Sequence, residues 1–232
     1  MVIENGQIIE SHQTDSGYDP ISQAKNLINN VAYDQIMATG YGRGLFEISF
    51  DSQTVTEIKA YARGVKELYP KARTILDIGG QDSKAISLFE QGKIKKFEMN
   101  DRCAAGTGKF LEIMAKALGF SIEEFGNKAC KAAKDLQINS MCTVFAESEV
   151  TSLIARGEDR IAIAKGLHMS VARRAVNMLK RVSVNGDFVF AGGVAKNQCM
   201  RSLLEKALNK KIHVPDNPQM IGAFWAALLI GD

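Results

Sequence analysis

The stretch Asp77–Lys84, with the sequence DIGGQDSK, is the end of a strand that runs into a glycine turn. The residues Thr74–Ile78 have the composition of a buried β-strand, and Gly79 and Gly80 break it. Glycines let backbone N–H groups approach phosphate oxygens, while acid, amide and hydroxyl side chains hold a metal ion or orient a water. Taken alone, the stretch also fits an ordinary β-turn in a hairpin.

Two further glycine turns occur in the chain. The segment Phe190–Asn197, FAGGVAKN, is a second junction of strand, glycines and helix, suited to the close approach of an adenosine and its phosphates. Gly106-Thr107-Gly108 is a further turn of small residues, which makes it the second turn in chain order and the Gly192-Gly193 turn the third. None of them is a Walker loop or a Gly-x-Gly-x-x-Gly dinucleotide motif. Each is weak evidence alone, but three in one chain favour a nucleotide site.

The hydrophobic pattern around these turns predicts an α/β protein. Helices are expected at Ile21–Val31, Val55–Tyr69, Phe110–Leu118, Ile161–Val182, Ala195–Leu208 and Pro218–Ile230. Strands are expected at Met1–Ile3, Gln7–Ile9, Gln35–Ala38, Thr74–Ile78, Lys84–Phe89, Ile94–Met99, Phe188–Phe190 and Ile212–Val214. Because strands occur both as hairpins and in alternation with helices, we expect mixed sheets in two similar halves.

Two cysteines stand in polar or glycine-rich segments. Cys103 lies in Asn100–Gly108, NDRCAAGTG, and Cys142 lies in Ser140–Glu149, SMCTVFAESE. Each precedes a segment of helical periodicity, so a thiolate there faces free backbone N–H groups and the positive end of a helix dipole. Two thiolates do not complete a four-ligand site, but a pair from each of two subunits does.

Cysteines can serve several chemical roles, and the sequence pattern favours some over others. A structural zinc site or a redox dithiol favours C-x-x-C pairs, which this chain lacks. An iron–sulfur cluster is held by four thiolates and does not require all of them from one chain. The plainest alternative is that the cysteines are buried and structural. Cys130 and Cys199, each within a segment of helical character, fit that alternative better than Cys103 and Cys142.

Composition narrows the classes of function. The chain has 232 residues with 29 basic and 26 acidic side chains, and the basic ones cluster only in pairs, so no nucleic-acid partner is expected. No apolar stretch approaches the roughly 20 residues of a membrane span, and no secretory signal is expected at the N-terminus. We therefore expect no membrane partner and a cytoplasmic protein with reduced thiols or metal-bound cysteines.

At these residues the chain resembles the ATP-dependent activators of 2-hydroxyacyl-CoA dehydratases, relatives of the ATP-binding subunits of benzoyl-CoA reductase. The family belongs to the superfamily of acetate and sugar kinases, heat-shock chaperones and actin. The matching segments span nearly the whole chain in family order: Ala38–Arg43, Asp77–Lys84, Asn100–Gly108, Cys142–Glu149, Ala191–Ala195 and Asn217–Gln219.

The resemblance implies two ribonuclease-H-like domains that close on ATP·Mg, and a homodimer that shares one [4Fe–4S] cluster. Cys103 and Cys142 fall on the cluster ligands, and Asp77 and Gln81 on the catalytic positions, with Gln81 expected to orient the attacking water and Mg²⁺ expected near Asp77. The residues expected to bind ATP or ADP are Gly79, Gly80, Asp82, Ser83, Lys84, Gly106, Thr107, Gly108, Gly192, Gly193, Val194 and Ala195.

The resemblance also predicts the division of the chain. The first domain is expected at residues 1–76 plus 216–232, and the second, with the cluster ligands, at residues 77–215. The family begins with a strand and a first phosphate loop that this sequence does not show, so the first domain is expected to be N-terminally truncated.

The function implied is an ATPase that passes one electron to a 2-hydroxyacyl-CoA dehydratase or a related acyl-CoA reductase. Its electron donor is expected to be a ferredoxin or flavodoxin. Two alternatives stay open: a small-molecule kinase of the same fold, which would need a substrate pocket but neither Cys103 nor Cys142, and a non-catalytic nucleotide-binding dimer.

Overall fold

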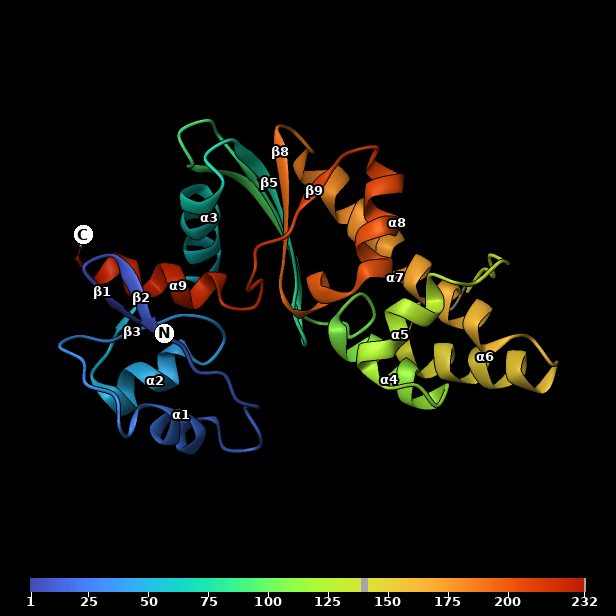
Figure 1. The fold of residues 1–232 in the computed structure, drawn as a ribbon, viewed down its shortest axis with the longest axis horizontal. Helices are drawn as coiled ribbons and strands as arrows, with labels where there is room; N and C mark the ends of the chain where they lie inside the picture. The colour runs from blue at the N-terminus through green and yellow to red at the C-terminus, as the bar shows by residue number, and fades with distance from the viewer. Residues whose placement is uncertain (139–141, 232) are drawn as a thin grey trace. The chain divides into compact units, whose positions relative to one another are not determined.

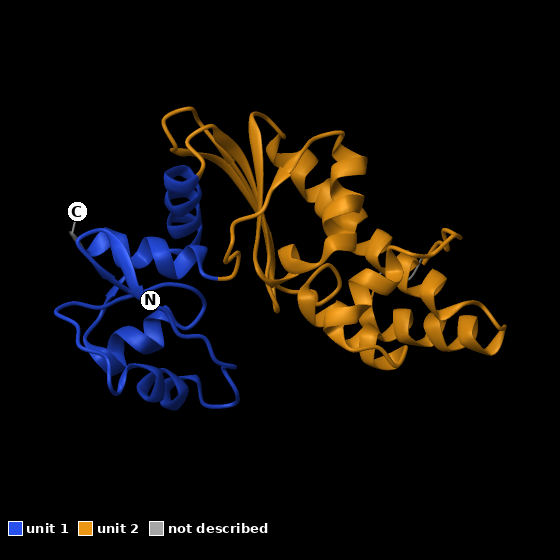
Figure 2. Cartoon of the chain, in the orientation of Figure 1, with its two compact units in different colours: residues 1–68, 220–232 blue, residues 69–219 orange. Residues whose placement is uncertain are grey.

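The computed structural model of the protein describes residues 1–138 and 142–231. They form two compact units, residues 1–68 with 220–232 and residues 69–219, which Figure 2 colours separately. Each unit contains both helices and strands. The expected α/β class with mixed sheets is confirmed, because parallel and antiparallel strand pairs both occur.

The second unit is built on a five-stranded sheet in the order β7-β6-β5-β8-β9 (Figure 1). The central strand β5 runs antiparallel to β6 and parallel to β8. The elements of this unit are β5 (Ala72–Ile78), β6 (Ser83–Leu88), β7 (Ile94–Asn100), α4 (Gly108–Ala117), α5 (Ile122–Ala129), α6 (Thr143–Ala155), α7 (Arg160–Val182), β8 (Asp187–Ala191), the 3₁₀ helix η1 (Gly193–Lys196), α8 (Gln198–Leu208) and β9 (Ile212–His213).

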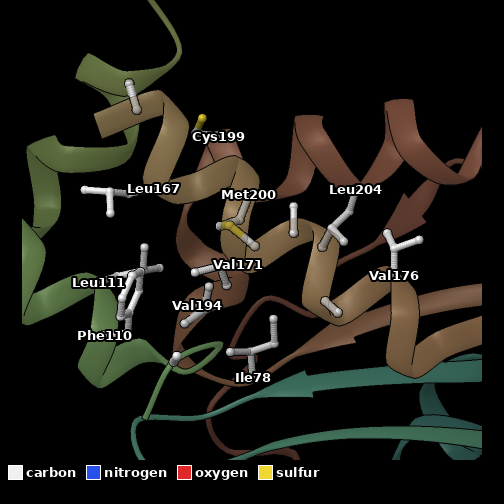
Figure 3. Close-up of a cluster of buried hydrophobic side chains, with 14 of the residues drawn as sticks. Ile78, Phe110, Leu111, Leu167, Val171, Val176, Val194, Cys199, Met200 and Leu204 are labelled. Carbon is white, nitrogen blue, oxygen red and sulfur yellow. The ribbon is translucent and has the colours of Figure 1, made fainter. Parts of the chain in front are cut away.

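The core of this unit joins the sheet to its helices. Helix α7 packs on β6 and β7, and α8 packs beside α7. Figure 3 shows Ile78 of β5, Phe110 of α4, Val171 of α7, Val194 of η1 and Met200 of α8 in one cluster of buried side chains. Because side chains from many elements, β5 and β8 among them, share this cluster, the turns that follow these two strands are attached to a common, closely packed support.

The first unit is the smaller of the two and, in its described residues, has only two-stranded sheets. Its elements are β1 (Val2–Glu4), β2 (Gln7–Glu10), α1 (Pro20–Ile28), β3 (Met37–Ala38), α2 (Arg43–Phe50), β4 (Gln53–Thr54), α3 (Glu57–Leu68), α9 (Ile221–Leu228) and the 3₁₀ helix η2 (Leu229–Gly231). Strands β1 and β2 form the predicted hairpin, in which Asn5 and Gly6 both have positive φ, as a type I′ turn requires. Helices α3 and α9 pack closely at Gly64, where a Cβ would lie 3.1 Å from both Ile221 O and Trp225 Cβ.

Several expected helices differ from the structure. The helix predicted at Ala195–Leu208 is two elements, because Asn197 has an extended backbone and its side-chain Oδ1 accepts the Met200 N–H at 3.1 Å, which starts α8. The last helix is α9, shorter than the predicted Pro218–Ile230 and continued by η2. Helices α2 and α5 are not among the predicted elements.

Among the described residues, no helix is long and apolar enough to cross a membrane.

Candidate nucleotide site and cysteine segments

The carboxyl end of β5 carries a buried ion pair. Asp77 on β5 lies opposite Lys84 on β6, and Lys84 Nζ donates to Asp77 Oδ2 at 3.2 Å and to Asp82 Oδ1 at 2.7 Å. The side chains of Lys84 and Asp77 are 1% and 2% exposed, and that of Asp82 is 13% exposed. A charge that is removed from water is stable only when it is paired, so these three side chains form one interdependent group.

The first two glycine turns contact each other through the backbone. The Gly108 N–H donates to Gly79 O at 2.8 Å, and the Lys109 N–H donates to Gly80 O at 2.9 Å. The turn at Gly79 is closed by its own N–H, which donates to Asp82 O at 2.9 Å. A Cβ at position 108 would lie 3.0 Å from Gly79 O, so a larger residue would force the two turns apart.

The third glycine turn reaches the same place from the parallel strand β8. Gly192 has φ +83°, and a Cβ there would lie 2.4 Å from Ile78 O and 2.5 Å from Asp77 Oδ1. Its N–H donates to Pro218 O at 2.8 Å. Only glycine allows both this backbone conformation and this approach to Asp77. The three turns predicted separately therefore meet at the carboxyl ends of β5 and β8.

Two residues beside the third turn were not assigned a role from the sequence. Gln219 Nε2 lies 3.2 Å from the place of a Cβ on Gly193, and its Oε1 accepts from Lys196 Nζ at 2.5 Å. Lys196 is exposed and places a positive charge at the end of η1. The sequence feature that pointed to Gln219 was the segment Asn217–Gln219. This segment matches the family, but it has no glycine or catalytic pattern of its own.

A buried histidine supports the start of α8. His168 of α7 is fully buried, and its Nδ1 donates to Ala164 O at 2.7 Å, so its Nε2 accepts from Asn197 Nδ2 at 2.9 Å. Burial lowers the pKa of His168 to about 4, against a smaller opposite effect of the bond to Ala164. The ring is therefore neutral at neutral pH, and it holds Asn197 where the third turn passes into α8.

The remaining predicted nucleotide-binding residues divide into buried and exposed side chains. Gln81, which was predicted to orient the attacking water, is exposed at the tip of the β5–β6 turn. Other side chains point inward: Ser83, Thr107, Val194 and Ala195 are buried. The Thr107 hydroxyl donates to Ala104 O at 2.6 Å. Buried side chains leave only the backbone of these positions for a ligand.

The two predicted cluster ligands are both exposed. Cys103 lies between β7 and α4, in a loop where Asn100 Nδ2 donates to Cys103 O at 2.9 Å. Cys142 is the N-cap residue of α6, with φ −104° and ψ 145°. Ser140 and Met141, the residues before it in the predicted motif, lie outside the described residues. Helices α4 and α6 pack against each other.

The other two cysteines correct part of the sequence interpretation. Cys199 is 2% exposed in the first turn of α8, as expected for a structural cysteine. Cys130 is exposed, because α5 ends at Ala129 and Cys130 is its C-cap residue. The described residues contain no group of three or more His, Cys, Asp or Glu side chains placed to hold a metal ion.

The sequence and fold of this chain are similar to those of known ATPases. Residues 18–230 match the sequence profile of the BadF/BadG/BcrA/BcrD ATPase family. The chain belongs to this ATPase family. It is 47% identical over 192 residues to the activator of lactoyl-CoA dehydratase from Anaerotignum propionicum, covering 83% of this chain and 73% of that protein. The resemblance inferred from the motifs is confirmed.

Two solved structures have the same fold as this ATPase family member. The activator of the 2-hydroxyisocaproyl-CoA dehydratase from Clostridium difficile, with bound ADPNP, superposes with a TM-score of 0.85 at 37% identity, over 98% of this chain and 87% of that one. Component A of the (R)-2-hydroxyglutaryl-CoA dehydratase from Acidaminococcus fermentans gives a TM-score of 0.83 at 38% identity, over 94% and 85%.

Proposed function

We propose that this protein is an ATP-hydrolysing activator that transfers one electron to a 2-hydroxyacyl-CoA dehydratase or a related acyl-CoA reductase. The observation that carries the proposal is the meeting of three glycine turns around the buried Asp77–Lys84 pair. The family membership and the activator relatives support the same function. The solved relative with ADPNP supports a nucleotide as the ligand of this fold.

The glycine turns fit the phosphates of ATP or ADP. Gly79, Gly80 and the turn Gly106–Gly108 would lie against the phosphates, since turns of small residues let a phosphate approach the backbone closely. Gly192 and Gly193 would lie against the adenosine. Val194 and Ala195 would contact it through their backbone only. Lys196 and Gln219 lie beside this turn, and their side chains would contact the bound nucleotide there.

Asp77, Asp82 and Lys84 supply the electrostatics of the site. Two carboxylates and one ammonium leave one excess negative charge in the group, which fits a hydrated Mg²⁺ that accompanies the nucleotide. Asp82 is the more exposed carboxylate, while Asp77 is enclosed by Lys84 and the Gly192 backbone. In place of the catalytic role that the resemblance implies for Asp77, we therefore propose that Asp77 and Lys84, with buried Ser83, position the turn and that Asp82 contacts the metal's water shell.

Gln81 is the residue proposed to orient the attacking water. Its side chain is exposed at the tip of the turn that Asp77 and Lys84 fix. An amide both donates and accepts hydrogen bonds, so it can hold a water in line with the terminal phosphate, as amides do in other nucleotide hydrolases.

Cys103 and Cys142 fit a [4Fe–4S] cluster as half of its ligand set. Both thiols are exposed, and thiolates are the donors that such clusters require. Two cysteines from each of two copies would complete four ligands, which makes the homodimer part of the proposal. The cluster would supply one-electron chemistry, with a ferredoxin or flavodoxin as donor in the cytoplasm. Cys142 is the N-cap residue of α6, so it stands at the positive end of that helix dipole, which would favour the negative charge of a cluster.

The proposed function is tested with the dimer reconstituted anaerobically, reduced, and mixed with a purified 2-hydroxyacyl-CoA dehydratase. We expect dehydratase activity with ATP and none with ADPNP, because hydrolysis drives the transfer. Gln81→Ala should lower ATP turnover about 100-fold. The matched control is Gln91→Ala, an exposed glutamine in the next turn of the same sheet, which should not change turnover. ATP turnover that instead requires an added small-molecule acceptor would identify a kinase and refute the proposal.

A further inference from the structure

Cys130 and Cys199, which the proposed function does not use, lie together where α5 meets α8. Cys130 ends α5, with its N–H bonded to Gly126 O at 3.0 Å. Gly126, one turn earlier, lies directly against the side chain of Asn197, since a Cβ there would be 2.4 Å from Asn197 Oδ1. Cys199 follows Asn197 by two residues. The packing of α5 on α8 thus places the last turn of one helix beside the first turn of the other.

Burial raises the pKa of the Cys199 thiol, and the neighbouring Cys130 raises it further. Lys165 of α7 acts in the opposite direction, and its Nζ is fixed by Asp135 Oδ1 at 2.7 Å and Ala132 O at 3.0 Å. Figure 3 shows the Cys199 sulfur at the edge of the buried cluster, directed away from the labelled apolar side chains.

We propose that Cys130 and Cys199 form an oxidation-sensitive dithiol that closes to an intrachain disulfide with a small-molecule disulfide as oxidant. A single buried cysteine is most often only a small apolar side chain. This pair differs because an exposed thiol and a buried thiol stand at the end of α5 and in the first turn of α8, where these two helices pack together. The exposed thiol is the one that an oxidant reaches, and the buried thiol is the one that completes the bond.

The reaction balances with glutathione disulfide as the oxidant. The Cys130 thiolate attacks one glutathione sulfur, the glutathione S–S bond breaks, and one glutathione thiolate leaves. The Cys199 thiol then loses its proton and attacks the Cys130 sulfur, which releases a second glutathione that takes up the proton. Two electrons pass from the two cysteines to the glutathione disulfide. The second step is the slow one, because the raised pKa of Cys199 keeps its thiolate scarce.

The disulfide would join the end of α5 to the first turn of α8. Cys199, its residue in α8, lies three residues after the end of η1. Such a link fixes the helix that begins at Asn197, next to the third glycine turn. Because it joins residues within one chain, its formation does not require the cluster, the nucleotide or the dehydratase, and it is tested separately from the proposed function.

The experiment treats the folded full-length chain with glutathione disulfide, alkylates the remaining thiols after unfolding, and digests with trypsin. The sequence predicts cleavage that leaves Cys130 in Ala129–Lys131 and Cys199 in Asn197–Arg201. We expect a linked peptide with the summed mass of these two less two hydrogen atoms, which dithiothreitol separates. Unfolding the protein before oxidation should abolish the selective pairing.

Two single variants serve as matched controls. Cys199→Ser should stop the reaction at a glutathione adduct on Cys130, and Cys130→Ser should leave Cys199 unmodified by glutathione in the folded protein. A wild-type product that stays a glutathione adduct on Cys130, an unreacted Cys130, or a disulfide from either cysteine to Cys103 or Cys142 would each overturn the proposal.

Discussion

The glycine turns and the cysteine segments of the second unit are built in opposite ways. The turns are closed by backbone hydrogen bonds and surround side chains that are almost fully buried. Cys103 and Cys142 stand exposed on loops next to helices, and the buried cluster of side chains does not include them. Fold stability therefore constrains the residues of the turns, whereas under the proposed function a bound cluster would constrain the two cysteines. Substitutions should separate these two kinds of constraint.

The largest loss of stability is expected for Lys84→Met. It leaves the Asp77 carboxylate buried without the ammonium that pairs with it, which costs about 3–5 kcal/mol in free energy of unfolding. Urea unfolding at neutral pH measures the loss. Lys95→Met, at an exposed lysine on β7 of the same sheet, is the control and should change little. A loss below about 1 kcal/mol for Lys84→Met would show that the pair does not hold the turn.

Gly192→Ala should cost about 3–4 kcal/mol, because the new Cβ meets the backbone of Ile78 at a positive φ. Nucleotide binding, measured by calorimetry, should be lost together with stability. Gly44→Ala is the control, since nothing lies within 4 Å of its Cβ position. Unchanged stability of Gly192→Ala would mean that the third turn does not approach β5 as described.

Stability should also fall with acidity through His168. Its folded pKa, about 4, lies below the ordinary value of 6.5, so the unfolded chain binds the proton more tightly. The contribution of the neutral His168 ring to the free energy of unfolding is complete above pH 6.5. It declines by about 3 kcal/mol as the pH falls to 4. Unfolding curves across this range measure the slope. His168→Asn removes the titrating ring and should flatten its share of the slope, while an identical slope in the variant would contradict the assignment.

The smallest effect on stability is expected at the exposed cysteines. Cys103→Ser and Cys142→Ser should change the free energy of unfolding of the iron-free protein by no more than about 0.5 kcal/mol. Thermal unfolding without iron measures this. A loss of several kcal/mol in either variant would mean that the cysteine is a packing residue, and the contrast with the glycine turns would disappear.

Much of the second unit was predictable because its signals are local. The buried strand before Asp77, the hairpin after it and the long helix Arg160–Val182 all follow from hydrophobic period and turn residues. Helix α5 carried a signal that was missed, since Ser121 and Glu124 have the spacing of a capping box and the Ser121 side chain accepts the Glu124 N–H. Helix α2 has no comparable cap at Gly42 and no fully buried residue.

The contacts that assemble the site were not predictable from local pattern. Nothing in the segment Phe190–Asn197 shows that Gly192 lies against Asp77, because that contact follows from the parallel pairing of β5 with β8. The exposure of Cys130 depends on where α5 ends, and its place near the first turn of α8 depends on helix packing. Assignments of Cys103, Cys142 and the nucleotide-binding residues to their ligands stay predictions.

The most direct test of the proposed activator is the iron content of the anaerobically reconstituted protein, measured with its visible absorbance. The wild type and Cys130→Ser should bind about four iron atoms per dimer, whereas Cys103→Ser and Cys142→Ser should each lose the iron and the absorbance. Retention of a full cluster in both of the latter variants would contradict the account.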